Sequence, residues 1–103
     1  MGSIIPDDRE DTCHWCGRVG FTHKHHIFGG PNRKWSEKYG LYVHLCPRHH
    51  NMSDEGIHFN KEMREGYQRL AQFHFELEYA CKHSASEEQA KAEFMRIFGR
   101  NYL

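Results

Sequence analysis

Two half-sites made of cysteine and histidine lie in the first half of this 103-residue chain. Cys13 and Cys16 form a Cys-x-x-Cys pair, and Cys46 and His49 form a Cys-x-x-His pair that begins thirty residues after Cys16. Thiolate and imidazole groups at this spacing are typical of a closed, tetrahedral structural zinc site. We therefore expect these side chains to bind Zn²⁺ and the bound metal to contribute folding energy.

The fourth ligand of this zinc site is open between three side chains. His49 has the expected spacing from Cys46, His50 is adjacent to it, and Cys81 is distant but chemically able. The four cysteines would also allow two disulfides, but residues 1–12 lack the long apolar stretch of a secretory signal. No stretch approaches the length of a membrane span. We therefore expect a cytoplasmic protein, without membrane contact, whose cysteines bind metal.

A second group of histidines lies between and just after the zinc half-sites: His25, His26, His50 and His58. A neutral imidazole can accept a proton from water at neutral pH. Imidazoles beside open coordination positions can also hold a divalent cation such as Mg²⁺, Mn²⁺ or Ni²⁺, which stabilises charge on a phosphate. Four other histidines are expected to be structural or solvated: His14, His23, His74 and His83.

Charge is unevenly distributed along the chain, although the formal net charge is zero. Residues 13–50 carry six positive side chains and one negative side chain, whereas residues 1–12 and 51–103 carry more negative than positive ones. The segment with the metal motifs is therefore basic, which suits a phosphate-bearing partner such as DNA. Three positive side chains close to the tandem histidines are candidates for phosphate contacts: Arg33, Lys34 and Lys38.

The first half of the chain has the pattern of a β-hairpin. Residues 19–27 alternate like a strand, which would place His25 and His26 on opposite faces. Residues 28–40 contain a Gly-Gly-Pro-Asn turn and are expected to form a loop, and residues 41–45 are expected to form the second strand. The tandem histidines should therefore have different partners.

The second half of the chain has the spacing of amphipathic helices. Apolar side chains recur every three or four residues from Phe59 to Leu77. Ser86 and Gln89 have the spacing of a capping box that opens a final helix, and Gly99 is placed to end it. Two helices that cover a small hairpin would give an α+β domain. The polar first eleven residues are expected to be a loose leader.

His25-His26-Ile27 and Gly29-Gly30 lie between the two half-sites, and His50 directly follows the second half-site. Together with the half-sites, these residues resemble the HNH endonuclease family. The stretch that begins at His26 is also similar to small phage-encoded HNH proteins. The resemblance covers residues 12–60 and implies an α+β fold with a ββα-metal hairpin-helix module, supported by the Cys3His zinc site. The remaining residues, 61–103, would be a helical extension of two helices within one domain, 1–103.

The resemblance also implies a role for each histidine of the second group. His25 corresponds to a ligand of the catalytic divalent metal, and His26 corresponds to the general base. His50 corresponds to a second ligand of that metal, and His58 to a further ligand or a phosphate contact. The implied activity is that of a metal-dependent endonuclease that hydrolyses phosphodiester bonds in DNA.

One departure from the family keeps a second function open. The family usually places an asparagine at the start of the second strand, where it orients the base, and here Asn32 or His44 would have to replace it. The alternative is a catalytically weak or inactive zinc-stabilised module of phage origin that binds nucleic acid or protein. A homodimer would be favoured if Tyr67, Phe75 and Tyr79 formed an exposed patch.

Overall fold

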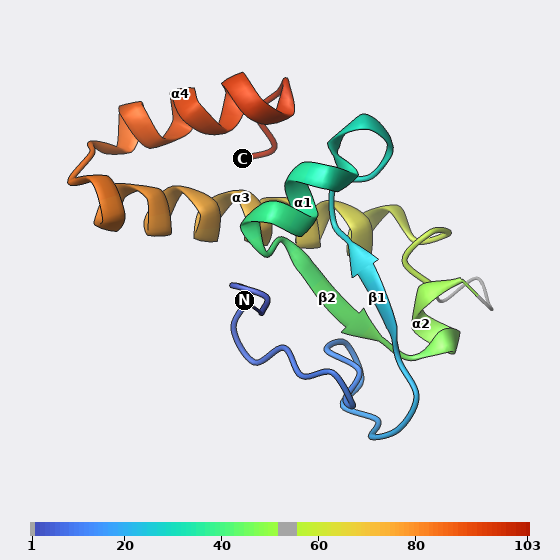
Figure 1. Ribbon diagram of the computed structural model, residues 1–103. Helices are drawn as coiled ribbons and strands as arrows, with labels where there is room; N and C mark the ends of the chain where they lie inside the picture. Colours follow the sequence, from blue (N-terminus) through green and yellow to red (C-terminus); the bar gives the residue numbers. More distant parts are fainter. Residues whose placement is uncertain (1, 52–55) are drawn as a thin grey trace.

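The computed structural model describes residues 2–51 and 56–103 and has an α+β architecture (Figure 1). Across these residues, none of the helices combines the length and the apolar character needed to span a lipid bilayer. In chain order the elements are β1 (His23–His26), the 3-10 helix η1 (Gly30–Asn32), α1 (Arg33–Tyr39), β2 (Tyr42–Leu45), α2 (Pro47–His50), α3 (Lys61–His83) and α4 (Glu87–Phe98).

The two strands form the expected antiparallel hairpin, in which His25 is opposite Val43 and His26 is opposite Tyr42. β1 is shorter than the alternation over residues 19–27 predicted. Val19 instead pairs with Thr12 in an isolated bridge, so the beginning of that stretch belongs to the N-terminal turn region and not to the sheet. The alternation itself is confirmed at the tandem histidines, because the His25 and His26 side chains have different partners, described below.

The segment between the strands contains a helix, and the expectation of a loop throughout residues 28–40 was wrong. The turn residues form only η1, which leads directly into α1. The buried Ser36 hydroxyl accepts a hydrogen bond from the Phe28 N–H and donates one to the Phe28 carbonyl, which holds α1 against the end of β1. α1 ends at Gly40, whose φ of 70° is the left-handed conformation that glycine adopts without strain.

The N-terminal segment is packed against the domain, so the prediction of a loose leader was also wrong. Ile5 is buried in the core, and the Ile4 N–H donates to the Gly40 carbonyl at 2.9 Å. The Asp8 carboxylate accepts from both the backbone N–H and the Nδ1 of His44, at 2.7 Å each. Apolar burial and these bonds outweigh the polar composition of the segment.

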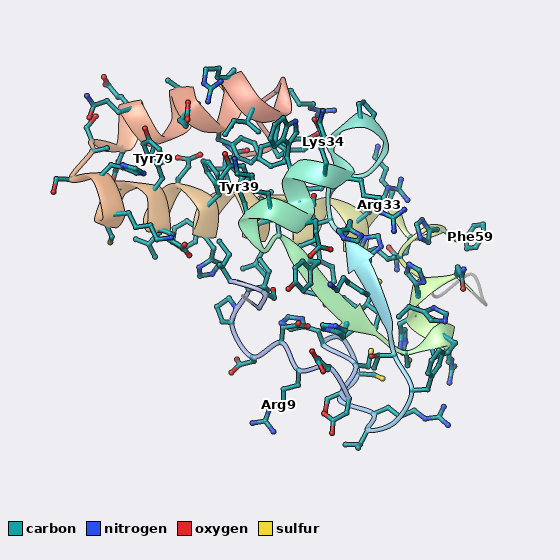
Figure 2. The ribbon with its side chains drawn as sticks, in the orientation of Figure 1. Arg9, Arg33, Lys34, Tyr39, Phe59 and Tyr79 are labelled. Atoms are coloured by element: carbon teal, nitrogen blue, oxygen red, sulfur yellow. The ribbon has the colours of Figure 1, made fainter. Side chains whose placement is uncertain are left out.

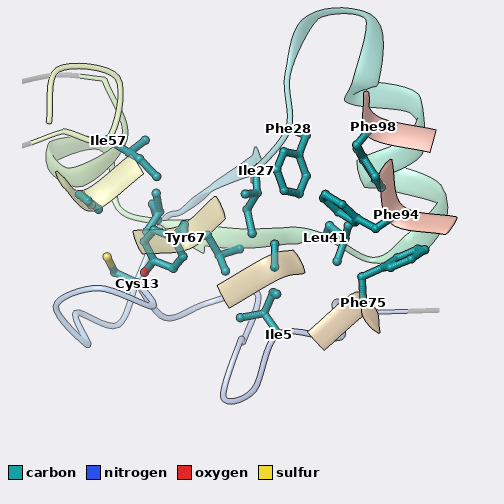
Figure 3. Packing of buried hydrophobic residues seen from close by; sticks show 14 of the residues in the cluster. Ile5, Cys13, Ile27, Phe28, Leu41, Ile57, Tyr67, Phe75, Phe94 and Phe98 are labelled. Carbon is teal, nitrogen blue, oxygen red and sulfur yellow. The ribbon is translucent and has the colours of Figure 1, made fainter. Parts of the chain in front are cut away.

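Helix α3 passes behind the hairpin, and α4 folds back on α3 (Figures 1 and 3). The Phe94 ring is fully buried, with centroid distances of 5.5 Å to Phe28 and 4.6 Å to Phe98. The capping box at the start of α4 and the left-handed Gly99 at its end are confirmed. The face of α3 that packs into the core differs from the face that the apolar spacing predicted. Leu77 belongs to the predicted face but is 52% exposed.

The patch that would have favoured a homodimer is not exposed. Tyr67 and Phe75 are buried in the core, and only Tyr79 lies at its margin. The Phe75 ring contacts Tyr39 of α1 and Phe94 of α4, so it joins α3 to the rest of the domain instead of forming a free surface. This removes the one sequence argument for self-association.

Candidate metal centres

The first candidate centre joins the N-terminal turn to the end of β2. Cys13 and Cys16 lie on a tight turn that is closed by a 2.8 Å hydrogen bond from the Gly17 N–H to the Cys13 carbonyl. Cys46 directly follows β2 and precedes α2, whose first turn brings His49 back over it. One ligand atom from each of the four side chains lies within 4.8 Å of all the others, so the group can hold a metal ion.

The separations within this group fit a tetrahedral zinc site. Zn–S bonds of about 2.3 Å would place tetrahedral sulfur atoms about 3.8 Å apart, and slightly less for a sulfur and a nitrogen. The Cys16 and Cys46 sulfur atoms are 3.9 Å apart, and the Nδ1 of His49 lies 3.3 Å from the Cys46 sulfur. The structure therefore gathers His49 as the fourth member, while Cys81 is exposed on α3 and His50 belongs to the second group.

The protein environment favours a thiolate at Cys13. Burial acts to raise the pKa of this thiol, but backbone hydrogen bonds, from Cys46 first and then from Cys16 and Trp15, outweigh it and lower the pKa. The pKa of Cys16 is raised, first by burial and further by the neighbouring thiols of Cys13 and Cys46. Several thiolates crowded together repel one another, and a bound cation relieves that repulsion.

The second candidate centre consists of three imidazoles, those of His25, His50 and His58, whose ligand atoms also lie within 4.8 Å of one another. His25 comes from β1 and His50 from the end of α2. His58 reaches the cluster because backbone N–H groups of Ile57 and His58 donate back to the carbonyls of His49 and His50. The side chain of Ile57 is fully buried, so His58 is attached to the core by its neighbour.

The geometry of the three rings fits cis positions on one cation. The Nε2 atoms of His50 and His58 are 3.1 Å apart, and metal–nitrogen bonds of about 2.1 Å at right angles would place them about 3 Å apart. Among the described residues, His25 Nε2 is the one buried side-chain nitrogen or oxygen without a hydrogen-bond partner. A buried polar atom of this kind is costly unless something binds it, and a metal ion would do so.

Two imidazoles of this cluster, those of His25 and His50, stay in the form that binds metal. Burial, followed by the neighbouring His50 and His58 rings, lowers the pKa of His25 to about 3. Burial, followed by the His58 and His23 rings, lowers the pKa of His50 to about 4. Both rings are therefore neutral at pH 7, and a neutral imidazole has the free lone pair that a cation requires.

His23 joins this centre, although sequence reasoning placed it among the structural or solvated histidines. Its Nδ1 lies 2.9 Å from the Nδ1 of His50. If the Nδ1 of His50 carries the proton of that hydrogen bond, its Nε2 keeps a lone pair that points toward His58. A hydrogen bond on the far nitrogen of a ligating histidine fixes its tautomer and orientation. The two-residue spacing from His25 on the same strand face was the signal for this role.

His26 lies apart from the cluster, on the other face of β1. Its Nε2 is 2.8 Å from a carboxylate oxygen of Glu37, and its Nδ1 accepts a 3.3 Å hydrogen bond from the Nε of Arg33. The hydrogen bond from His26, and then the hydrogen bond and the charge of Lys24, hold the pKa of Glu37 below its usual value against the opposing effect of desolvation. Sequence reasoning missed Glu37, although it is the only acidic residue in residues 13–50.

The remaining candidate residues are divided between this face and other places. Arg33 and Lys34 line an open pocket of about 580 Å³ together with His26 and Glu37, and Figure 2 labels both cations near the start of α1. The ammonium group of Lys38 lies against the rings of Trp35 and Tyr39, outside that pocket.

The two side chains considered as replacements for the family's asparagine have other partners. The Asn32 amide donates to the Phe98 carbonyl at 3.1 Å, which joins the turn between the strands to the end of α4. His44 pairs with Asp8. Both ring nitrogens of His26 are meanwhile bonded to side chains of α1, so the chain supplies an orienting group from a different element.

Comparisons of the chain with protein-family models, with curated proteins and with solved structures found no match.

Proposed function

We propose that the protein is a metal-dependent endonuclease of the HNH type that hydrolyses DNA phosphodiester bonds. The observation that carries this proposal is the convergence of the His25, His50 and His58 rings on one point. His26, the neighbour of His25 in the chain, is held by the carboxylate of Glu37. The cysteine-containing centre would hold Zn²⁺ and fix the ends of the hairpin. The arrangement of β1, β2 and α2 around both centres would then be a ββα-metal module.

In this proposal His26 is the general base. The Glu37 carboxylate accepts a hydrogen bond from the Nε2–H of His26, so the lone pair of the imidazole is on Nδ1. A carboxylate in this position holds the ring in one tautomer and stabilises the imidazolium that forms when Nδ1 takes a proton from water. Glu37 would thus perform the orienting task for which the family uses its asparagine.

Arg33 would respond to the substrate. Its guanidinium is bonded to His26 Nδ1 at 3.3 Å, a long hydrogen bond, and it lies in the same pocket as Lys34. A phosphate of DNA is a stronger partner for a guanidinium than a neutral imidazole is. Binding of the phosphate would draw Arg33 away and free Nδ1 to accept the proton of the attacking water.

In the hydrolytic step the water oxygen forms a bond to phosphorus, its proton passes to His26 Nδ1, and the bond between phosphorus and the 3′ oxygen breaks. The 3′ oxygen takes a proton from solvent to become the hydroxyl, and His26 then returns its proton to solvent. A divalent cation on the three imidazoles, when bound, would stabilise charge on the phosphate and on the departing 3′ oxygen. The products would be a 5′ phosphate and a 3′ hydroxyl.

The proposal is tested by nicking of supercoiled plasmid with Mg²⁺, Mn²⁺ or Ni²⁺. We expect the wild-type protein to nick, and His26→Ala to lower the rate by a factor of about 100 to 10,000, the usual contribution of a general base. His74→Ala is the matched control, because His74 lies on α3 outside both metal groups and outside the pocket beside His26, and it should nick like the wild type. Equal, metal-independent rates for the wild type and His26→Ala would refute the catalytic proposal.

Both ring nitrogens of His26 already take part in hydrogen bonds, and this supports a second candidate function. If Arg33 keeps its bond to Nδ1 when DNA is bound, the ring has no lone pair for water. The protein would then be a zinc-stabilised module that binds nucleic acid or a protein without turnover. DNA binding that weakens with salt, combined with no nicking in any of the three metals, would favour this function.

A further inference from the structure

A basic groove lies outside both metal centres, between the N-terminal half of α3 and the segment that follows α4. It has a volume of about 620 Å³, and its lining is predominantly polar. Five of the side chains that line it are charged, four positively and one negatively: Lys61, Arg64, Arg69, Arg100 and Glu65. We call it the α3–tail groove. The helical extension that supplies these residues lies outside the region that resembles HNH proteins.

Most of the positive charge in the α3–tail groove is not neutralised. Glu65 lies 3.9 Å from the ammonium group of Lys61, an exposed pair that holds little energy. The Arg100 guanidinium lies 4.5 Å from the centre of the Tyr102 ring, which positions the group without removing its charge. Among the described residues, no carboxylate lies within salt-bridge distance of Arg64, Arg69 or Arg100.

A buried glutamine fixes the two walls of the groove relative to each other. The side chain of Gln72 on α3 is fully buried. Its amide nitrogen donates to the side-chain oxygen of Asn101 at 2.8 Å, and its amide oxygen accepts from the Tyr102 N–H at 2.6 Å. The arginines of helix and tail are therefore presented on a preformed surface, which reduces the entropic cost of binding an extended anion.

Arg64 joins the α3–tail groove to the backbone of the segment that carries His58. Arg64 lines the groove, and its guanidinium donates to the carbonyls of Ile57 and His58 at 3.3 Å and 3.4 Å. His58 is a member of the imidazole cluster. Cationic side chains therefore lie in two places. Some are on α3, which follows His58 in the chain, and Arg33 and Lys34 are beside His26.

We infer that the α3–tail groove binds the phosphate backbone of duplex DNA beyond the cleavage site, on the side where Arg64 contacts the His58 backbone. This inference rests on the proposed nuclease function for its choice of partner, and on the charges, the Gln72 network and the Arg64 contacts for its location. Guanidinium groups bind phosphate oxygens through two parallel N–H donors, and such contacts are independent of sequence. Each contact that neutralises a phosphate releases a counterion and makes binding depend on salt.

The test is the binding of a fluorescein-labelled DNA duplex, followed by anisotropy between 50 and 200 mM KCl without added divalent metal. The double variant Arg69→Gln/Arg100→Gln should bind on the order of tenfold more weakly at low salt. Its slope of log affinity against log salt should be smaller by about 1.8, since each phosphate contact contributes about 0.9. Circular dichroism and zinc content should match those of the wild type, because both side chains are exposed.

The matched control is Arg9→Gln/Arg96→Gln, which removes the same two charges outside the groove (Figure 2 labels Arg9). It should bind DNA like the wild type. Equal weakening in the two double variants, an unchanged salt slope in the groove variant, or no binding of DNA by the wild type would overturn the inference. Tighter binding of a single-stranded RNA, or of an acidic peptide that displaces the duplex, would overturn the assignment to duplex DNA.

The nicking assay separates this inference from the proposed nuclease function. A wild type that binds the duplex through the groove but cleaves in no metal would contradict the nuclease proposal and leave the groove standing. A wild type that cleaves, with a groove variant that binds and cleaves equally well, would contradict the groove and leave the nuclease proposal standing.

Discussion

Replacing Cys16 by serine should remove the metal from the cysteine-containing centre and destabilise the domain. Cys16 is exposed, so the loss of its sulfur costs little packing by itself. Its sulfur lies 3.9 Å from that of the buried Cys46, which would be left in an incomplete site. Cys81 is also exposed but lies on α3, outside both metal groups, which makes Cys81→Ser a control of identical chemistry and similar exposure.

The expected loss of stability follows from the contribution of a structural metal to the free energy of folding. Structural zinc contributes on the order of 10 kcal/mol at neutral pH, whereas the free energy of unfolding of a whole domain is about 5–15 kcal/mol. The turn that carries Cys13 and Cys16 is joined to β2 by this centre and by the hydrogen bond from the His14 N–H to the His44 carbonyl. Loss of even 4 kcal/mol, at roughly 4–8 °C per kcal/mol, would lower the Tm of Cys16→Ser by more than about 15 °C. Cys81→Ser should stay within about 0.5 kcal/mol of the wild type.

The assay is thermal unfolding followed by circular dichroism, together with zinc content by mass spectrometry of the purified proteins. Wild type and Cys81→Ser should each carry one equivalent of tightly held zinc, and Cys16→Ser should carry much less. If the two serine variants have the same Tm and the same zinc content, the reasoning about this centre is wrong. A loss of zinc in Cys81→Ser but not in Cys16→Ser would show that the fourth ligand comes from α3.

Three further substitutions test other parts of the account. His23→Ala should weaken binding of Mn²⁺ or Ni²⁺ at the imidazole centre by about 10–100-fold in calorimetric titrations, because His50 loses the bond that orients it, and unchanged affinity would refute that role. Glu37→Gln should lower kcat for nicking on the order of tenfold while KM stays within about twofold, and a parallel rise in KM would show that Glu37 acts in binding instead. Gly40→Ala should lower the free energy of unfolding, measured in urea, by about 1–3 kcal/mol, because φ at this position is 70° and a Cβ would lie 2.8 Å from the Gly2 backbone oxygen. A loss below about 0.5 kcal/mol would contradict this.

The two cysteine-containing half-sites that could hold a metal ion were predictable from sequence because their spacing is fixed by local geometry. A Cys-x-x-Cys turn and a Cys-x-x-His helical turn each bring their two ligands together wherever they occur. Alternation along β1 likewise separates His25 from His26 without any knowledge of the rest of the fold. The capping box at Ser86 is equally local, which is why α4 begins where the sequence predicted.

The features that sequence reasoning missed depend on contacts between distant segments. α1 has only Trp35 and Tyr39 as large apolar residues, both partly buried, so it lacks the apolar stripe that marks a helix. Without α1 there was no means to place Glu37 beside His26. Alternation along β1 could have placed His23 on the face of His25, but its pairing with His50 depends also on the position of α2 beside β1, which is set by the tertiary fold.

The most direct test of the central claim is an anomalous-scattering map of crystals soaked in Mn²⁺, recorded at the zinc and manganese absorption edges. The account predicts two separate cations, zinc between Cys13, Cys16, Cys46 and His49, and manganese bound by the imidazoles of the second cluster. Bonds from manganese to His25, His50 and His58 would establish the centre on which the proposed chemistry depends. A single cation in the crystal, or manganese bound away from these three rings, would contradict the account.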